Sequence, residues 1–233
     1  MGRALPLLRI YGVTMNKPIV FILVCLNLTG CKNFSMLSFG TEQGKDMSPK
    51  LVMVSGQSNA ERLYTWGGLT GWSQIRQVSD SFVNCSMAGA KIDDFDDNSA
   101  VMRNCYATLG DRKPDIILWY QGEADATDSL YAVHDMKTLA LFRKFKAMWP
   151  GVKIVYAQLH TVDPLRWPGL VRWNDIKAQQ ASYSMEGVMM IRTDDITPGP
   201  CDGEGDGIHY DQKGDVILGQ RFAQGYRRLT LGD

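Results

Sequence analysis

The chain has 233 residues, and its 25 Lys and Arg side chains balance its 25 Asp and Glu side chains, so the formal charge is zero. A neutral chain lacks the general excess of positive charge that binds nucleic-acid phosphates, and it differs from the highly charged chains that stay disordered. Hydrophobic residues make up 45% of the sequence, which is ordinary for a globular protein. At about 150 residues per domain, the length allows one or two domains.

The N-terminal segment has the pattern of an export signal. Residues 19–26 form an uninterrupted apolar run, much shorter than the ~20 residues that span a bilayer. Met15-Asn16-Lys17 precedes this run, and Leu28-Thr29-Gly30-Cys31 follows it. The arrangement resembles a bacterial lipoprotein signal, which implies cleavage before Cys31, a lipid on that thiol and a membrane-anchored protein of the cell envelope. A generic secretory signal or an ordinary apolar N-terminus is the alternative.

This interpretation divides the chain into three parts. Residues 1–30 are an export signal with an upstream extension, and Met15 is the working start. Residues 31–48 are polar and form a tether, and residues 49–233 form the folded domain. The first part holds three basic and no acidic side chains, so the exported chain would carry a formal charge of −3. The remaining length leaves room for one domain.

Five short apolar runs follow the tether, and amphipathic stretches separate them. Each run is bounded by Gly, Pro, Asp or Ser, which is typical of a buried strand. The expected strands are residues 51–54, 82–85, 115–120, 153–159 and 188–192. Strands that are apolar on both faces and separated by helices predict a parallel sheet with helices on both sides.

Three stretches have the spacing of amphipathic helices, namely residues 129–149, 170–184 and 211–229. In the last, Asp211 is the expected N-cap. The apolar face of the first is expected to consist of Met136, Leu139, Phe142, Phe145 and Trp149. Because ligands of such sheets bind at the carboxyl ends of the strands, the residues after each strand are the place to look for a site.

Turns with glycine and polar residues follow the first three strands. Ser58 stands in Gly56–Ala60, where a strand-to-helix turn would expose its hydroxyl and direct backbone N–H groups at an oxyanion. Gly89 would bring a further N–H to the same space, although a plain turn glycine explains it as well. Gln121 and Glu123 directly follow the third strand, where helix capping is the alternative explanation.

The chain has three histidines, so each can be weighed as a general base. His209 stands three residues after Asp206 in a glycine-containing loop, where the two side chains can form a hydrogen bond. That pairing would leave the far imidazole nitrogen free to take a proton from Ser58. His134 lies among charged residues of a predicted helix and is expected to face solvent. His160 ends the fourth strand, where it would contact the substrate or cap the strand.

Three motifs, in this order and in this strand context, resemble those of SGNH hydrolases. They are Gly-Gln-Ser-Asn-Ala at 56–60, Trp-Tyr-Gln-Gly-Glu-Ala-Asp at 119–125 and Asp-Gly-Ile-His at 206–209. More narrowly, they are similar to the sialate O-acetylesterase and acetylxylan-esterase branch, over roughly residues 49–230. The resemblance implies a three-layer α/β/α, flavodoxin-like fold with a five-stranded parallel sheet. It also implies a cofactor-independent esterase that removes O-acetyl groups from carbohydrates.

The resemblance assigns roles to individual residues. Ser58 would be the nucleophile, His209 the general base and then the general acid, and Asp206 the group that orients the imidazole. The N–H groups of Ser58 and Gly89 would form the oxyanion hole. Activity should fall at acidic pH, because a protonated His209 cannot accept the proton of the serine.

The sequence departs from the wider superfamily after the third strand, where an Asn that donates to the oxyanion is replaced by Glu123. An ionised Glu cannot donate a hydrogen bond. Either Glu123 is protonated in a dry site, or it supports His209 or neighbouring donors while Gln121 takes part of the donor role. We favour the supporting role.

The sequence indicates the residues that contact the substrate less clearly than it indicates the catalytic residues. The candidates near the serine and the strand ends are Gln57, Asn59, Trp66 and His160. Aromatic rings in a glycine-rich stretch after the serine, and in the loop after the fourth strand, would stack on sugars or pack onto the domain. These rings are Tyr64, Trp66, Trp72, Trp167 and Trp173.

No metal site is predicted. Residues 202–207 resemble the opening of a calcium loop, but the twelfth position holds Lys213 in place of the expected Glu. No pair of cysteines has zinc-binding spacing. Cys85, Cys105 and Cys201 would remain after export, which allows one disulfide without fixing its partners.

Two other functions remain open. One is an SGNH esterase or lysophospholipase that acts on other acyl esters, against which the lack of a long apolar lid argues mildly. The other is a non-catalytic, glycan-binding lipoprotein that keeps the fold. The intact set of Ser58, Asp206 and His209 argues against the second.

Overall fold

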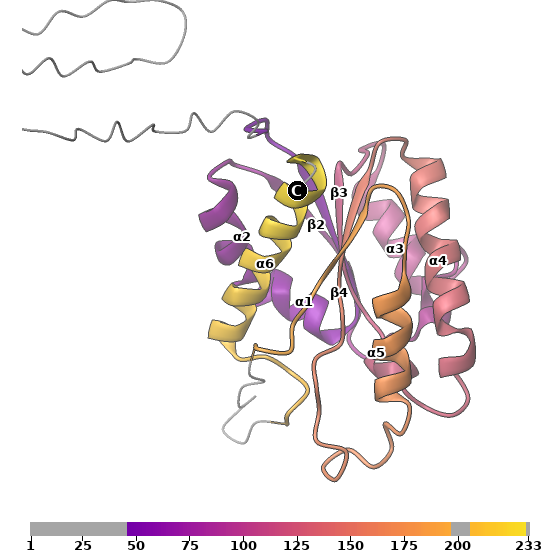
Figure 1. The fold of residues 1–233 in the computed structure, drawn as a ribbon. Coiled ribbons are helices and arrows are strands. Elements are labelled where there is room, and N and C mark those ends of the chain that lie inside the picture. The colour runs from indigo at the N-terminus through magenta and orange to yellow at the C-terminus, as the bar shows by residue number, and fades with distance from the viewer. Residues whose placement is uncertain (1–45, 197–205, 232–233) are drawn as a thin grey trace, which may run out of the picture. The chain divides into compact units, whose positions relative to one another are not determined.

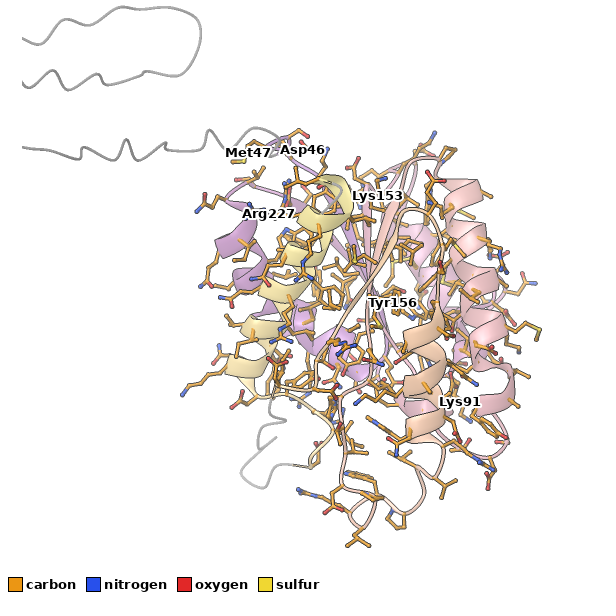
Figure 2. The ribbon with its side chains drawn as sticks, in the orientation of Figure 1. Asp46, Met47, Lys91, Lys153, Tyr156 and Arg227 are labelled. Carbon is orange, nitrogen blue, oxygen red and sulfur yellow. A yellow bond between two sulfur atoms is a disulfide. The ribbon has the colours of Figure 1, made fainter. Side chains whose placement is uncertain are left out.

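The computed structural model describes residues 46–196 and 206–231. The expected signal, Cys31, most of the tether, Cys201 and residues 202–205 of the calcium-like loop lie outside the described residues. At the first described residues of the chain, the carbonyl oxygens of Asp46 and Ser48 accept hydrogen bonds from Arg76. Asp46 and Arg227, both labelled in Figure 2, line the same small pocket near the end of the last helix. The last residues of the expected tether are therefore held against the domain.

One parallel sheet forms the centre of the molecule, with the strand order β2-β1-β3-β4-β5 (Figure 1). Its strands are β1 (Leu51–Gly56), β2 (Ser81–Ser86), β3 (Ile116–Tyr120), β4 (Lys153–Ala157) and β5 (Val188–Ile191). The five expected strands are confirmed. β1 continues two residues further than expected, and β4 ends two residues earlier.

Helices cover both faces of the sheet. Because successive strand residues point to opposite sides, Val52 and Val54 enter one core while Met53 enters the other. The first core is covered by α1 (Ser58–Thr65), α2 (Gly68–Arg76) and α6 (Gln212–Leu231). The second is covered by α3 (Ala100–Leu109) and α4 (Tyr131–Met148). The helix α5 (Trp173–Ser182) lies beside α4 (Figure 1), and its Trp173 and Ile176 belong to the first core. The expected three-layer α/β/α fold is confirmed.

The glycine-rich stretch after the serine is helical, although the sequence predicts a loop. The backbones of α2 and α6 touch, so that a Cβ atom on Gly71 would lie 1.9 Å from the carbonyl oxygen of Val216. A Cβ on Gly219 would lie 1.8 Å from the carbonyl oxygen of Gly68. These glycines therefore permit close packing of two helices. As a result, Trp72 is fully buried in the core and does not reach the mouth of a site.

The expected helix at residues 129–149 is present as α4, and Phe142, Phe145 and Trp149 of the expected apolar face are buried. Two other positions differ from the prediction. Met136 is 61% exposed, whereas His134 is completely buried. The prediction that His134 faces solvent is wrong, because its Nδ1 atom lies 2.8 Å from the buried carboxylate of Asp125. The buried face consists of His134, Thr138, Leu141, Phe142 and Phe145. The spacing of the apolar residues could not show that His134, a polar residue, is buried because it has a buried partner.

Polar side chains start two of the helices. Asp211 stands directly before α6, and its carboxylate accepts a hydrogen bond from the N–H of Gly214 at 2.7 Å. This contact confirms the expected N-cap. Ser99 caps α3 in the same way through the N–H of Met102, at 3.0 Å. Within the described residues, no helix has the length and apolarity needed to cross a membrane.

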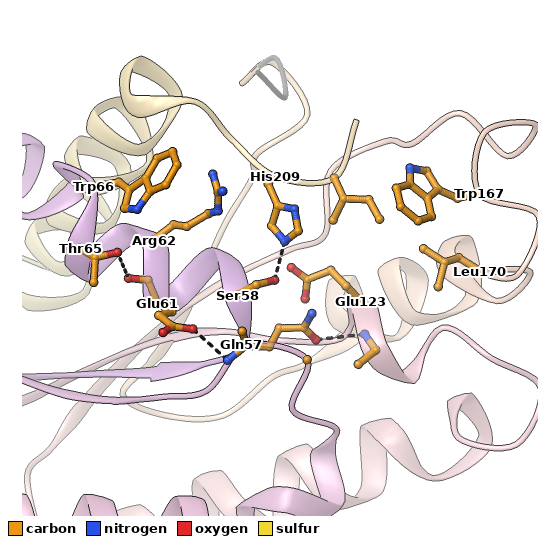
Figure 3. A pocket seen from close by; sticks show the side chains of 14 residues that line it. Gln57, Ser58, Glu61, Arg62, Thr65, Trp66, Glu123, Trp167, Leu170 and His209 are labelled. Atoms are coloured by element: carbon orange, nitrogen blue, oxygen red, sulfur yellow. Dashed lines mark hydrogen bonds between the residues drawn. The ribbon is translucent and has the colours of Figure 1, made fainter. Parts of the chain in front are cut away.

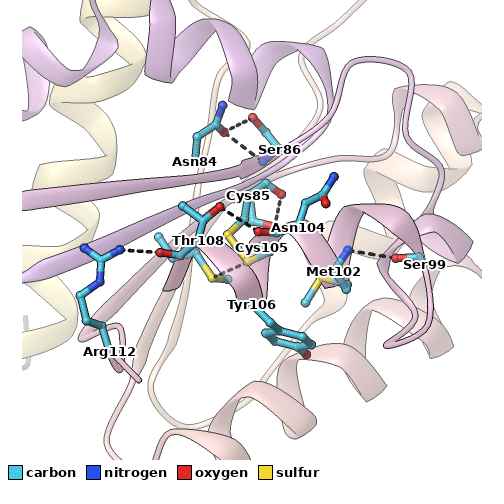
Figure 4. The surroundings of a disulfide bond; sticks show 12 residues. Asn84, Cys85, Ser86, Ser99, Met102, Asn104, Cys105, Tyr106, Thr108 and Arg112 are labelled. Atoms are coloured by element: carbon cyan, nitrogen blue, oxygen red, sulfur yellow. Dashed lines mark hydrogen bonds between the residues drawn. A yellow bond between two sulfur atoms is a disulfide. The ribbon is translucent and has the colours of Figure 1, made fainter. Parts of the chain in front are cut away.

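A disulfide joins Cys85 of β2 to Cys105 of α3 (Figure 4). Both residues are buried in the second core. The bond therefore links the edge strand to the helix that packs on it. The sequence allowed one disulfide among three cysteines, and the structure pairs these two.

Candidate active site

The carboxyl ends of β1, β2 and β3 and the loop before α6 surround a cavity of about 600 Å³ (Figure 3). In a parallel sheet of this strand order, β1 and β3 lie at the point where the chain changes direction across the sheet. Ligands bind to such sheets at that point. Of the predicted residues, Ser58, Gly89, Glu123 and His209 line this cavity.

Ser58 is held above the end of β1 by a turn that requires glycine. Gly56 has a φ of +131°, and a Cβ atom there would lie 1.9 Å from the carbonyl oxygen of Tyr120 on β3. The next N–H, that of Gln57, donates to the same carbonyl at 2.9 Å. The chain then enters α1, so that Ser58 is its first residue and presents its hydroxyl to the cavity.

Three side chains that are far apart in sequence form a continuous chain of hydrogen bonds. The Oγ atom of Ser58 lies 2.8 Å from Nε2 of His209, and Nδ1 of His209 lies 2.5 Å from Oδ2 of Asp206. A carboxylate accepts hydrogen bonds, so Nδ1 carries the proton and Nε2 is the acceptor for the serine hydroxyl. The structure thus brings the three predicted residues together in the order that nucleophilic catalysis requires.

The loop that carries Asp206 keeps this carboxylate charged. Burial works to raise its pKa, but hydrogen bonds from the backbone and side chain of His209 and the N–H of Ile208 outweigh that effect. The pKa of Asp206 therefore lies below its usual value. Both N–H groups donate to Oδ1 at 2.8 Å, while Oδ2 faces the imidazole. An anionic Asp206 can stabilise the positive charge that His209 acquires when it takes a proton.

Ser58 and Gly89, whose backbone N–H groups are the predicted oxyanion donors, both line the cavity. Ser58 is the first residue of α1, and its N–H has no acceptor among the described residues. Gly89, in the turn after β2, lines the same cavity, and its N–H is likewise unpaired within the described chain. Gly89 has a φ of +72°, a conformation that favours glycine. The predicted pair of backbone donors is therefore present on the cavity wall.

Glu123 contacts Asn59 and does not contact His209 directly. Its Oε1 atom accepts a hydrogen bond from Nδ2 of Asn59 at 3.0 Å. The same amide nitrogen donates to the carbonyl oxygen of Ile208 at 3.1 Å, and Oδ1 of Asn59 accepts from the N–H of Tyr210 at 3.4 Å. Asn59 thus binds the residues on both sides of His209. This geometry places Glu123 in the supporting position that the sequence favours.

The environment of Glu123 also favours its protonated form. Burial raises its pKa from the usual 4.5 to about 7. Hydrogen bonds from its own N–H and from Asn59 act in the opposite direction, and the charge of Asp125 adds to the increase. Its second oxygen, Oε2, has no hydrogen-bond partner among the described residues. A fully ionised carboxylate would leave that oxygen uncompensated.

Gln121 does not take the donor role that the sequence allowed. Its side chain is completely buried, and its Nε2 atom donates to Asp125 at 2.8 Å and to the carbonyl oxygen of Ala90 at 3.4 Å. Asp125 also accepts from the N–H of Ile92 at 3.1 Å and contacts His134. The amide of Gln121 is therefore directed into a polar network behind the cavity. That network holds the segment that follows Gly89.

The predicted contact between His160 and the substrate is also wrong. His160 is buried, and its Nε2 atom lies 3.1 Å from the carbonyl oxygen of Gly207. Nδ1 lies 3.2 Å and 3.1 Å from the hydroxyls of Tyr120 and Tyr210. Burial lowers the pKa of His160, which favours a neutral ring that donates through Nε2 and accepts through Nδ1. His160 therefore supports the loop between Asp206 and His209 from inside the protein.

The outer wall of the cavity includes Trp66 and Trp167, which the sequence offered as candidates, and Arg62, which was not predicted. Arg62 lies on α1 and Trp66 directly follows that helix, and the Arg62 guanidinium stacks on the Trp66 ring at 4.0 Å. Trp66 is 39% exposed. Trp167 stands on the other side of the serine, with its indole N–H donating to the carbonyl oxygen of Asp206 at 2.6 Å (Figure 3). Recognition of α1 as a helix would have found Arg62.

The fold is that of the SGNH hydrolases, in which an α/β/α sandwich carries polar residues at the carboxyl ends of its strands. A family model described as "carbohydrate esterase, sialic acid-specific acetylesterase" matches residues 71–228. Because that match spans more than half of the sequence, the chain belongs to this family. Ser58 precedes the matched segment. Among curated proteins, none matches the sequence.

Solved structures with low sequence identity share the fold. A carbohydrate acetylesterase from Xanthomonas citri is similar with a TM-score of 0.61 and 16% identity, over 79% of this chain and 57% of that one. A protein from Arabidopsis thaliana is similar with a TM-score of 0.60 and 13% identity, over 77% of this chain and 98% of that one. A lipase/acylhydrolase from Enterococcus faecalis is similar with a TM-score of 0.53 and 14% identity, over 77% of this chain and 96% of that one. At these identities, the likeness extends to the fold alone.

Proposed function

We propose that this chain is a serine esterase that removes O-acetyl groups from carbohydrates. The observation that carries the proposal is the hydrogen-bonded series Ser58–His209–Asp206, with the serine hydroxyl open to the cavity. Membership of the acetylesterase family supports the reaction class. The particular sugar, for which sialic acid and xylan-type glycans are the candidates, belongs to the proposal.

In the first half of the reaction, Ser58 attacks the carbonyl carbon of the acetyl ester while His209 takes the hydroxyl proton at Nε2. The carbonyl oxygen becomes an oxyanion, which the N–H groups of Ser58 and Gly89 stabilise. Asp206 stabilises the imidazolium through Nδ1. The protonated His209 then donates its proton to the sugar oxygen, the C–O bond of the ester breaks, and the sugar hydroxyl leaves.

In the second half, water releases the acetyl group from Ser58. His209 takes a proton from the water as it attacks the acyl carbon, and the same two N–H groups stabilise the second oxyanion. The bond to the serine oxygen then breaks, His209 returns the proton to that oxygen, and acetate leaves. No cofactor takes part in this sequence of steps.

The walls of the cavity support a carbohydrate as substrate. Trp66 and Trp167 stand on opposite sides of Ser58, and flat aromatic surfaces bind the apolar faces of sugar rings. Arg62 adds hydrogen-bond donors between them for hydroxyl or carboxylate oxygens. A sugar bound between the indoles would place an acetylated hydroxyl over the serine.

The direct test is release of acetate from O-acetylated sialic acid and from acetylated xylan, by wild type and by Ser58→Ala. We expect wild type to release acetate from at least one of these substrates and the variant to lose the activity. A panel of p-nitrophenyl esters of increasing chain length accompanies this assay. A preference for long acyl chains would replace the proposal by a lysophospholipase-like activity.

A wild type that hydrolyses no ester faster than Ser58→Ala would refute the enzyme assignment. Binding of an acetylated glycan without hydrolysis would then favour a non-catalytic glycan-binding protein. Calorimetric titration with the same two glycans distinguishes that outcome from an inert protein.

We also propose that the enzyme acts in the bacterial cell envelope, anchored by a lipid on Cys31. The support is the apolar run at 19–26 and the Leu-x-Gly-Cys sequence that follows it. Growth with a labelled fatty acid should label wild type, and Cys31→Ala should abolish the label. An unlabelled wild type found only in the soluble fraction would overturn this proposal.

A further inference from the structure

Glu61 connects the helix that begins with Ser58 to the turn that contains Gly89. It lies three residues after Ser58 on α1, which is nearly one helical turn, and both residues line the cavity. The Oε2 atom of Glu61 accepts a hydrogen bond from the backbone N–H of Ala88 at 3.0 Å (Figure 3). Ala88 directly precedes Gly89, whose N–H is a predicted oxyanion donor. One side chain therefore joins the helix of the nucleophile to the turn of this donor.

The segment around Gly89 is a tight turn. The N–H of Ala90 donates a hydrogen bond to the carbonyl oxygen of Met87 at 3.1 Å, and Gly89 has a φ of +72°. A positive φ at the third position is typical of a type II turn, in which glycine is favoured there. A Cβ atom on Gly89 would meet no other atom within 4 Å. The backbone conformation, and not crowding, therefore accounts for the glycine.

Buried side chains hold the segment after Gly89. The carbonyl oxygen of Ala90 accepts a hydrogen bond from the side-chain amide of Gln121 at 3.4 Å. Two residues later, the N–H of Ile92 donates to the carboxylate of Asp125 at 3.1 Å. Both of these side chains are completely buried, so this half of the segment is fixed from the interior of the protein.

The segment before Gly89 lies at the surface, where fewer contacts hold it. Met87 and Ala88 are both exposed. The N–H of Met87 donates to the carbonyl oxygen of Gly56 at the end of β1, at 3.0 Å. Among the described residues, Glu61 is the one side chain that forms a hydrogen bond with the backbone of this stretch. Loss of Glu61 would therefore release the turn on the side that the interior does not hold.

We propose that Glu61 is a positioning residue that holds the turn of Gly89 in place relative to Ser58. This inference rests on the proposed esterase function. An oxyanion donor is most effective when it is already in place before the negative charge develops. A displacement of about 1 Å in an active site can lower the rate by about 10²-fold. Because Glu61 belongs to the same helix as Ser58, it fixes the donor with respect to the nucleophile and does not itself contact the ester.

The contact with Ala88 requires an acceptor but no charge. A glutamine in place of Glu61 can accept the same hydrogen bond through its side-chain oxygen, whereas an alanine cannot. Glu61 also stands in the first turn of α1, where a negative charge stabilises a helix. The two roles predict different results for glutamine, because positioning of the turn would be kept and stabilisation of the helix by charge would be lost.

Hydrolysis of p-nitrophenyl acetate, which has no sugar to contact the cavity wall, tests the proposal well below the melting temperature of each variant. We expect Glu61→Ala to lower kcat by about 5- to 30-fold with KM changed by less than about twofold, and Glu61→Gln to keep at least about half of the wild-type kcat. Affinity for a boronic acid, which forms a tetrahedral anionic adduct with Ser58, should fall in Glu61→Ala in parallel with kcat/KM. Glu186→Ala, at an exposed position, is the control and should match wild type.

A double-mutant cycle tests whether Glu61 acts through Gly89. Gly89→Pro removes the backbone N–H and should lower kcat by about 10²- to 10³-fold. In that background the turn has no donor to position, so adding Glu61→Ala should lower kcat by less than about twofold further. An equal effect of Glu61→Ala in both backgrounds would overturn the proposal, and so would a Gly89→Pro variant with the kcat of wild type.

The remaining outcomes separate this inference from the proposed function. If Ser58→Ala abolishes hydrolysis while Glu61→Ala keeps kcat within about twofold of wild type, the positioning role is wrong and the esterase stands. Equal losses in Glu61→Gln and Glu61→Ala would also refute it, because the charge and not the hydrogen bond would then matter. A loss confined to acetylated glycans would make Glu61 a sugar contact instead. A wild type no faster than Ser58→Ala overturns both proposals.

Discussion

The carboxyl group of Glu123 should make the stability of this fold depend on pH. Burial raises its pKa from 4.5 to about 7, the opposing hydrogen bonds being too weak to prevent it. Since one pKa unit corresponds to about 1.4 kcal/mol, charging this group in the folded protein costs about 3 kcal/mol more than in the unfolded chain. Glu123→Gln removes that cost while it keeps an oxygen for Asn59 to donate to.

The direction of the effect follows from the two protonation states. Below about pH 4.5 the carboxyl is protonated in both the folded and the unfolded protein, so pH has no influence through it. Between about 4.5 and 7 the unfolded chain ionises first, and the free energy of unfolding of wild type falls as pH rises. Glutamine does not titrate. The stability of Glu123→Gln relative to wild type should therefore increase by about 3 kcal/mol across this range.

Denaturant unfolding of both proteins, from about pH 4.5 to about pH 8, measures this difference. Asp215, whose pKa burial also raises to about 7, is present in both and cancels. Glu186→Gln, at an exposed position, shows the effect of removing one charge without a buried group. A relative stability of Glu123→Gln that stays constant within about 0.5 kcal/mol over the whole range would refute the reasoning.

Three further variants test other parts of the structure. Asp125→Ala leaves several buried donors unpaired and should lower the free energy of unfolding by about 3–5 kcal/mol. The kcat should also fall, because the segment after Gly89 loses a contact that holds it. Denaturant curves identical to those of wild type would contradict this prediction. Trp66→Ala should raise KM for an acetylated glycan about 3- to 10-fold and leave hydrolysis of p-nitrophenyl acetate unchanged, whereas an equal effect on both substrates would exclude sugar stacking. Replacing Cys85 and Cys105 by alanine should lower stability by about 3 kcal/mol, and reduction should destabilise wild type but not this variant.

The sequence predicted the strands and the principal site residues because both depend on simple geometry. A strand buried on both faces must be a short apolar run, and parallel strands bring their carboxyl ends to one edge. Ser58, Gly89 and Glu123 each follow such a run, so their shared location required no knowledge of side-chain packing. His209 and Asp206 could be paired because they lie three residues apart in one loop.

The helix α2 was missed because contacts with a distant segment of the chain stabilise it. Gly68 and Gly71 have low helix propensity, and in isolation they favour a loop. In the folded protein these glycines allow α6 to pack closely against α2, because a Cβ on Gly71 would overlap the backbone of Val216. A local reading of the sequence therefore could not place Trp72 in the core.

The roles of Gln121 and Glu123 depend on one backbone angle. Gly122 between them has a φ of +137°, a conformation that L side chains rarely adopt. On one side of it Gln121 donates to Asp125 in the interior, and on the other side Glu123 lines the cavity. The sequence shows a glycine that permits this angle, but it does not show that the angle is adopted.

Each side chain that faces the reacting ester is held by a buried polar residue or a backbone group from another segment. Asn59 and Glu123 hold the residues beside His209, Ala124 orients Gln57, and His160 supports the loop that carries Asp206. Buried polar groups must be paired, so changes in the supporting residues should weaken the fold together with the activity. Changes in Ser58 should reduce activity at nearly unchanged stability, and measuring both quantities for each variant separates the two groups.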